Sequence, residues 1–135
     1  MQSRSSHDPH SAPARTDTVL IVEDDPAHLL ITEHTLRFEH IPFTSTDNID
    51  DGWLQLQRGD ISVVITDLSL GAVTLIKRMR ATPRFATIPV IVSSGVGYQE
   101  QIQQALDAGA QAYLIKPHPL STLVELVRRA LDGEL

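Results

Sequence analysis

The chain has 135 residues, 41% of them hydrophobic, which is enough for one domain with a single core. Its formal net charge is −6 and its eleven Lys and Arg residues are scattered, which argues against direct nucleic-acid binding. There is no cysteine, so disulfides and thiolate metal sites are excluded. The apolar runs are shorter than the ~20 residues of a membrane span and no secretory leader opens the chain, so we expect a cytoplasmic protein without membrane contact.

Residues 1–16 are rich in Ser, Pro, His and Arg and lack any hydrophobic period, which predicts a disordered N-terminal tail. In residues 17–135, short β-rich runs alternate with helix-length segments, which predicts one domain. The expected strands are Val19–Val22, Phe43–Thr46, Val63–Thr66, Val90–Ser93 and Ala112–Ile115. Four of these runs resemble strands buried on both faces, whereas the less apolar Phe43 run is expected at an edge.

Five segments between and after these runs have the length of helices. They are Pro26–Glu39, Asn48–Arg58, Ala72–Arg80, Tyr98–Ala108 and Thr122–Leu131. Five βα units joined by right-handed crossovers predict an α/β fold with a doubly wound parallel sheet, (βα)5 and flavodoxin-like, in strand order 2-1-3-4-5.

Local signals mark several helix ends. Asp25 is the expected N-cap of the first helix, in which apolar residues recur at the spacing of an amphipathic helix: Ala27, Leu30, Ile31 and Phe38. Gly59 is expected as a C′ glycine of the second helix. A capping-box pair, Thr122 and Glu125, is expected to open the last helix.

Charged residues follow three of the expected strands. Glu23-Asp24-Asp25 follows the first, Asp67 the third and Lys116-Pro117 the fifth. The carboxyl ends of parallel strands open onto one edge, and the switch point of this strand order lies between strands 1 and 3. We therefore expect these acids and the lysine to meet in one crevice.

Three carboxylates gathered at one edge repel one another, so the arrangement requires a cation, and oxygen ligands favour Mg²⁺. A carboxylate that faces Mg²⁺ and a lysine can attack phosphorus, and Asp67 is best placed to form such an aspartyl phosphate. Ser94, which follows the fourth strand, would donate to a phosphoryl oxygen. Ser93 is the rival candidate.

Together these residues resemble the receiver domain of bacterial two-component response regulators (CheY-like), over Asp17–Leu135. The resemblance implies that Asp67 is the phosphoacceptor and that Lys116 pairs with the phosphate. It also implies that the peptide bond between Lys116 and Pro117 is cis. It also implies the following Mg²⁺ ligands: Asp67, Asp24, Glu23 through water, and the backbone carbonyl of Ser69.

The resemblance further implies a switch and its partners. Ser94 would move toward the phosphoryl group and Tyr113 would turn from exposed to buried, which changes the affinity of the face made by helix 4, strand 5 and helix 5 for a downstream protein. A histidine kinase or a histidine phosphotransfer protein of a phosphorelay would be the donor. Such a protein signals without turning over a substrate, and a homodimer is a further option.

Two features depart from the family pattern. The segment Leu68–Ala72 reaches helix 3 about three residues sooner than is usual, which questions the position of the Ser69 carbonyl. His118 stands where a Phe commonly follows Lys-Pro, and it is expected to be surface or half-buried, with an effect on phosphate lifetime as the alternative.

Several residues have plain structural explanations. Asp25 is expected to act as a cap, Ser93 to complete its strand, and the other histidines of the domain to be solvated or packed, because none has ligand spacing: His28, His34 and His40.

Two other functions remain open beside the phosphorylated receiver. One is a receiver-like interaction module that works without phosphorylation. The other, and weaker, is a Mg²⁺-dependent phosphatase or a flavin carrier. A phosphatase of the haloacid-dehalogenase type would need a second carboxylate two residues after Asp67, where Ser69 stands, and no Gly-rich phosphate loop follows the first strand.

Overall fold

The computed structural model describes residues 17–135; the tail expected in residues 1–16 lies outside this part. The elements are β1 Thr18–Val22, α1 Pro26–Phe38, β2 Phe43–Thr46, α2 Ile49–Arg58, β3 Ile61–Thr66, the short 3₁₀ helix η1 Leu68–Leu70, α3 Ala72–Arg80, β4 Val90–Ser94, α4 Gln99–Ala108, β5 Ala112–Ile115 and α5 Leu120–Leu131. Every expected strand and helix is present, with boundaries shifted by two residues at most.

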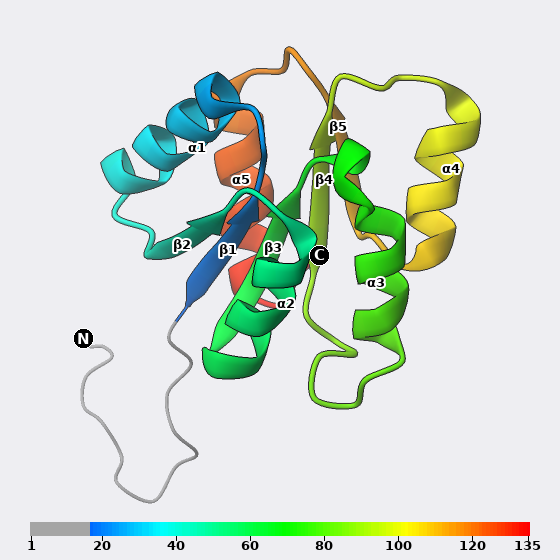
Figure 1. The fold of residues 1–135 in the computed structure, drawn as a ribbon. Helices are drawn as coiled ribbons and strands as arrows, with labels where there is room; N and C mark the ends of the chain where they lie inside the picture. Colours follow the sequence, from blue (N-terminus) through cyan, green and yellow to red (C-terminus); the bar gives the residue numbers. More distant parts are fainter. Residues whose placement is uncertain (1–16) are drawn as a thin grey trace, which may run out of the picture.

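The five strands form one parallel sheet in the order β2-β1-β3-β4-β5, as predicted. Helices α1 and α5 cover one face of the sheet, and α2, α3 and α4 cover the other (Figure 1). This arrangement is the doubly wound fold expected from the alternation of strands and helices.

Two apolar layers lie on either side of the sheet. Successive side chains of a strand point to opposite faces, so in β1 Leu20 and Val22 pack toward α2, α3 and α4, while Val19 and Ile21 pack toward α1 and α5. Strands β3 and β4 are buried along their whole length and β1 nearly so. The prediction of a buried strand is wrong for β5, which is only partly covered because it forms an edge of the sheet.

The helix ends follow the sequence in part. Asp25 caps α1 by accepting a 2.9 Å hydrogen bond from the Ala27 amide. The expected capping box is wrong, because α5 begins at Leu120 after Pro119, two residues before Thr122. Gly59 does end α2, but with φ −112° it is extended and not left-handed.

Helix α1 buries a different stripe from the one expected. Leu30, Ile31 and Phe38 are 54%, 47% and 81% exposed, whereas Leu36 is fully buried and Leu29 packs beside it. The helix carries two apolar stripes at helical spacing, and only the one through Leu29 and Leu36 faces the sheet. The packing expected for the first stripe is therefore wrong.

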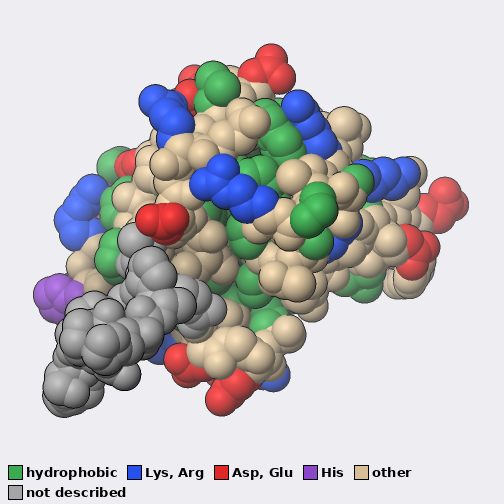
Figure 2. All heavy atoms as spheres, turned by 90° about the horizontal axis from the view of Figure 1, so that it is seen from below, with side chains coloured by type: hydrophobic (Ala, Val, Ile, Leu, Met, Phe, Trp, Pro, Cys, Tyr) green, Lys and Arg blue, Asp and Glu red, His purple; other side chains and the backbone are tan. Residues whose placement is uncertain are grey.

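Figure 2 shows the end of the molecule at which the strands begin. Charged side chains of both signs are interspersed there with hydrophobic and neutral ones, as the scattered distribution of Lys and Arg along the chain indicates. None of the helices in residues 17–135 has the length and apolar character needed to cross a membrane.

Candidate functional site

Main-chain hydrogen bonds extend the sheet just past the strand ends and fix the residues that follow. The Asp67 amide donates to the Val22 carbonyl at 3.1 Å, which joins the ends of β1 and β3 at the switch point. The Lys116 amide donates to the Ser94 carbonyl at 2.8 Å, at the ends of β4 and β5. The residues that the sequence placed at one edge are therefore held there by the backbone.

Three carboxylates meet at this edge. Oxygen atoms of Glu23, Asp24 and Asp67 lie within 4.8 Å of one another. Glu23 and Asp67 are 6% and 8% exposed, and Asp24 is open to solvent. A divalent ion with oxygen ligands at about 2.1 Å could bridge oxygens at this separation while keeping waters on its exposed side. The donor set therefore fits Mg²⁺.

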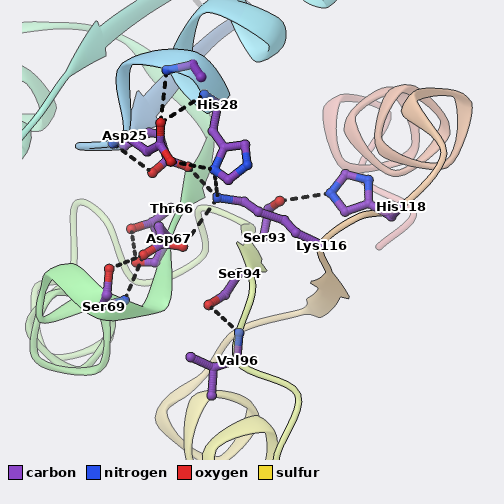
Figure 3. A network of polar contacts seen from close by, with 12 residues as sticks. Asp25, His28, Thr66, Asp67, Ser69, Ser93, Ser94, Val96, Lys116 and His118 are labelled. Atoms are coloured by element: carbon purple, nitrogen blue, oxygen red, sulfur yellow. Dashed lines mark hydrogen bonds and ion pairs between the residues drawn. The ribbon is translucent and has the colours of Figure 1, made fainter.

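Lys116 enters the same cluster (Figure 3). Its Nζ lies 2.7 Å from Glu23 Oε1 and 3.4 Å from Asp67 Oδ1, and its side chain is mostly buried. The peptide bond between Lys116 and Pro117 is cis. The three acids predicted a bound cation between them, but Lys116 itself supplies a positive charge to two of them, Glu23 and Asp67.

Asp67 is held from both sides. Its Oδ2 accepts hydrogen bonds from the Ser69 amide at 2.9 Å and from the Ser69 hydroxyl, while Oδ1 faces Lys116. Burial alone would raise the pKa of Asp67, but the bonds from Ser69 and the charge of Lys116 outweigh it and hold the pKa below the ordinary 3.8. The carboxylate is therefore ionised and partly shielded from water.

The short connection to α3 is a single turn. Asp67 caps η1, and Gly71 then adopts the left-handed conformation with φ 82°, so that α3 begins at Ala72 as expected. A residue with a Cβ would be strained at Gly71. The role of the Ser69 carbonyl as a metal ligand stays a prediction.

The two expected switch residues lie beside the turn that follows β4. Ser94 is the last residue of β4, and its hydroxyl accepts a 3.2 Å hydrogen bond from the Val96 amide. Tyr113 is half-buried and donates its hydroxyl proton to the Val96 carbonyl. Burial raises the pKa of Tyr113, while a hydrogen bond with Ser94 acts in the opposite direction. Both side chains thus contact one turn.

Ser93 and His118 contact each other. Ser93 Oγ lies 2.9 Å from His118 Nε2, which links the end of β4 to the segment before α5. Ser93 completes the strand and His118 is half-buried, as expected.

One histidine belongs to the site although its sequence spacing did not indicate it. His28 Nδ1 lies 3.2 Å from Lys116 Nζ and 3.2 Å from Asp25 Oδ2. His28 is half-buried, in keeping with the expectation of a solvated or packed side chain, but its contacts with Lys116 and Asp25 were not expected. His34 and His40 are exposed. The spacing did contain a signal. Asp25 follows β1 and caps α1, and His28 comes three residues later, so the two residues lie on the same face of the helix at the edge where the strands end.

Comparisons with known proteins identify the family of the chain. Residues 19–128 match the family described as response regulator receiver domain. The chain is 32% identical over 120 residues to chemotaxis protein CheY-3 of Vibrio cholerae, covering 84% of this chain and 91% of that protein.

Solved structures share the fold. A putative response regulator from Chloroflexus aurantiacus superposes with a TM-score of 0.81 at 28% identity, over 86% of this chain and 98% of that chain. The receiver domain of sensor histidine kinase PA1611 from Pseudomonas aeruginosa, solved with a magnesium ion in its active site cleft, superposes with a TM-score of 0.79 at 22% identity, over 86% and 98%. The chain therefore belongs to the response regulator receiver domain family.

Proposed function

We propose that Asp67 accepts a phosphoryl group from a histidine kinase or a histidine phosphotransfer protein, in a Mg²⁺-dependent reaction that changes how the domain binds a downstream protein. The observation that carries this proposal is the buried, ionised Asp67, which lies beside Lys116 and within 4.8 Å of the acids after β1. Receiver domains signal through such a change and do not turn over a substrate.

The residues divide the chemistry between them. An oxygen of Asp67 forms a bond to phosphorus while the bond from phosphorus to the leaving group breaks. The leaving group is the imidazole of a phosphohistidine, or acetate when acetyl phosphate is the donor, and it keeps the electron pair of the broken bond. Lys116 pairs with the phosphoryl oxygens. Glu23, Asp24, Asp67 and the Ser69 carbonyl would hold Mg²⁺, which when bound supplies positive charge to the transferring group. The receiver domain of PA1611 holds its magnesium ion in the active site cleft of the same fold.

The response would reach the surface through α4, β5 and α5. Ser94 moves toward the phosphoryl group, which frees its contact with Val96, and Tyr113 repacks behind it. Tyr98 and Ile115, which are 74% and 46% exposed, provide apolar contact area for a downstream protein or a second copy of the chain. We propose that this signalling takes place in the cytoplasm, the location expected from the sequence.

A receiver-like module that binds its partner without phosphorylation is the second candidate. It is favoured by the short segment after Asp67, in which Ser69 already donates two hydrogen bonds to one oxygen of the phosphoacceptor. These bonds would have to rearrange before that oxygen could attack phosphorus.

Incubation with acetyl phosphate and Mg²⁺, followed by intact mass measurement, separates the two candidates. We expect the parent chain to gain one phosphoryl group and Asp67→Asn to gain none. If the parent gains none either, with acetyl phosphate or with a phosphorylated histidine phosphotransfer protein, the unphosphorylated module is the better function.

The metal site has its own test by calorimetric titration with Mg²⁺. Asp24→Asn removes a ligand and should weaken Mg²⁺ binding about tenfold, or about 1.4 kcal/mol. Asp25→Asn is the matched control, because Asn is an equally good N-cap and the substitution removes the charge that lies beside Asp24 and His28. Equal losses in both variants would mean that Mg²⁺ senses the general negative charge and not Asp24 as a ligand.

A further inference from the structure

The ammonium group of Lys116 has three acceptors in three directions. They are Glu23 Oε1 at 2.7 Å, His28 Nδ1 at 3.2 Å and Asp67 Oδ1 at 3.4 Å. An ammonium group donates three hydrogen bonds and accepts none, so the contact with His28 is a hydrogen bond only if Nδ1 accepts and the ring proton lies on Nε2. Asp25 Oδ2 also lies 3.2 Å from Nδ1 and, as an acceptor, favours a proton on Nδ1. Only in the Nε2–H tautomer is Lys116 the hydrogen-bond partner of Nδ1.

The start of α1 fixes the place of this imidazole. Asp25 Oδ1 accepts hydrogen bonds from the amides of Ala27 and His28, at 2.9 and 3.4 Å, and so holds the first helical turn (Figure 3). His28 lies in that turn, and its ring reaches back over the strand ends to Lys116. The helix cap thus fixes the backbone of His28, while 44% of its side chain is exposed to solvent.

Lys116 also borders open space. A cavity of about 280 Å³ lies next to it, and its lining includes His28 itself as well as Ser93, Pro117 and His118. A lysine with only two acceptors could swing part of its ammonium group into this cavity. The bond to His28 completes the set of three and holds the group beside Asp67.

We propose that His28 is a positioning residue for phosphoryl transfer, which holds the Lys116 ammonium where it meets Asp67 and an incoming phosphoryl group. This inference rests on the proposed function of Asp67. A hydrogen bond donated by a charged group is stronger than one between neutral groups, so loss of this acceptor should slow transfer by about tenfold, or about 1.4 kcal/mol.

Two substitutions isolate the acceptor. His28→Leu removes it, whereas His28→Asn places an amide oxygen close to the position of Nδ1. With saturating Mg²⁺, we expect His28→Leu to lower the maximal rate of phosphorylation by acetyl phosphate about tenfold, with less than about a twofold change in KM and in Mg²⁺ affinity. His28→Asn should recover most of the rate. His34→Leu, at an exposed position of the same helix, is the control and should match the parent.

A spectroscopic measurement tests the contact without phosphorylation. Long-range ¹H–¹⁵N correlation spectra of the histidine rings at about pH 8 should show the Nε2–H tautomer for His28 in the parent chain and a loss of this preference in Lys116→Met. If the parent chain is not phosphorylated, the proposed function fails and this spectrum alone decides whether His28 holds Lys116. A parent spectrum with the proton on Nδ1, a His28→Leu rate equal to that of the parent, or no recovery in His28→Asn would overturn the inference.

Discussion

Lys116 carries the charge balance of the site. Without it, Glu23 and Asp67 would be two buried carboxylates that lack their nearest positive partner. We therefore expect Lys116→Met to lower the free energy of unfolding by about 2–4 kcal/mol in the absence of divalent ions. Mg²⁺ should restore part of this loss and should bind more tightly than in the parent chain.

Urea unfolding with EDTA and with Mg²⁺ measures both effects. Lys77→Met, at an exposed position of α3, is the matched control, with an expected change of less than about 0.5 kcal/mol. If Mg²⁺ leaves the loss in Lys116→Met unchanged, the lysine stabilises the domain by packing and not by its charge.

The lowered pKa of Asp67 makes stability depend on pH in a defined direction. A carboxyl group whose pKa is lower in the folded than in the unfolded state stabilises the fold above its unfolded pKa of about 3.9, and this contribution disappears as the pH falls through the folded value. We expect the unfolding free energy of the parent chain to fall more steeply below about pH 4 than that of Asp67→Asn. Asp107→Asn, at an exposed position of α4, should keep the slope of the parent chain. If the unfolding free energy of Asp67→Asn falls with pH as steeply as that of the parent, Asp67 does not cause the pH dependence.

At the scale of an element, α1 shows what a helical pattern leaves open. Its two apolar stripes have the same spacing, and only packing against the sheet distinguishes them. Leu36 is fully buried, so Leu36→Ala should cost about 2–4 kcal/mol, whereas Phe38→Ala, at an 81% exposed position, should cost less than about 0.5 kcal/mol. Urea unfolding of both variants is the measurement, and similar costs would show that Phe38 is also packed.

The helix ends show the same division between local and non-local causes. Asp25 and Asn48 cap their helices, because an N-cap needs only a side-chain oxygen and amides two or three residues further on. Thr122 and Glu125 have the right spacing for a capping box, yet α5 begins earlier, at Leu120, directly after Pro119. A local motif therefore predicts a helix start correctly only where the preceding residues are not themselves helical.

At the scale of the whole molecule, Arg80 joins segments that are distant in the sequence. Its guanidinium donates to the Gly109 carbonyl at 2.8 and 3.1 Å and to the Ile88 carbonyl at 2.8 Å, so that it links α3, the segment before β4 and the turn after α4. A Cβ at position 109 would lie 2.8 Å from Arg80 Nε, which explains the glycine there. Both carbonyls would lose their partner in Arg80→Met.

We expect Arg80→Met to lower the free energy of unfolding by about 2–4 kcal/mol, because hydrogen bonds from a charged donor are lost and carbonyls are left unpaired. Arg78→Met is the matched control. Arg78 is exposed, and its guanidinium carbon lies 3.9 Å from the centre of the Trp53 ring. Such a contact contributes about 1 kcal/mol at most at an exposed position. Thermal and urea unfolding of the two variants measure the difference, and equal losses would remove the special role of Arg80.

The sequence by itself determined the strands, the helices, their order in the sheet and the meeting of Glu23, Asp24, Asp67 and Lys116, because parallel βα units permit few topologies and bring all strand ends to one edge. Only the tertiary structure decided which acids Lys116 contacts, that His28 lies beside it and which stripe of α1 is buried. These features depend on side-chain directions and on neighbours distant in the chain, on which residue type and spacing give only partial information.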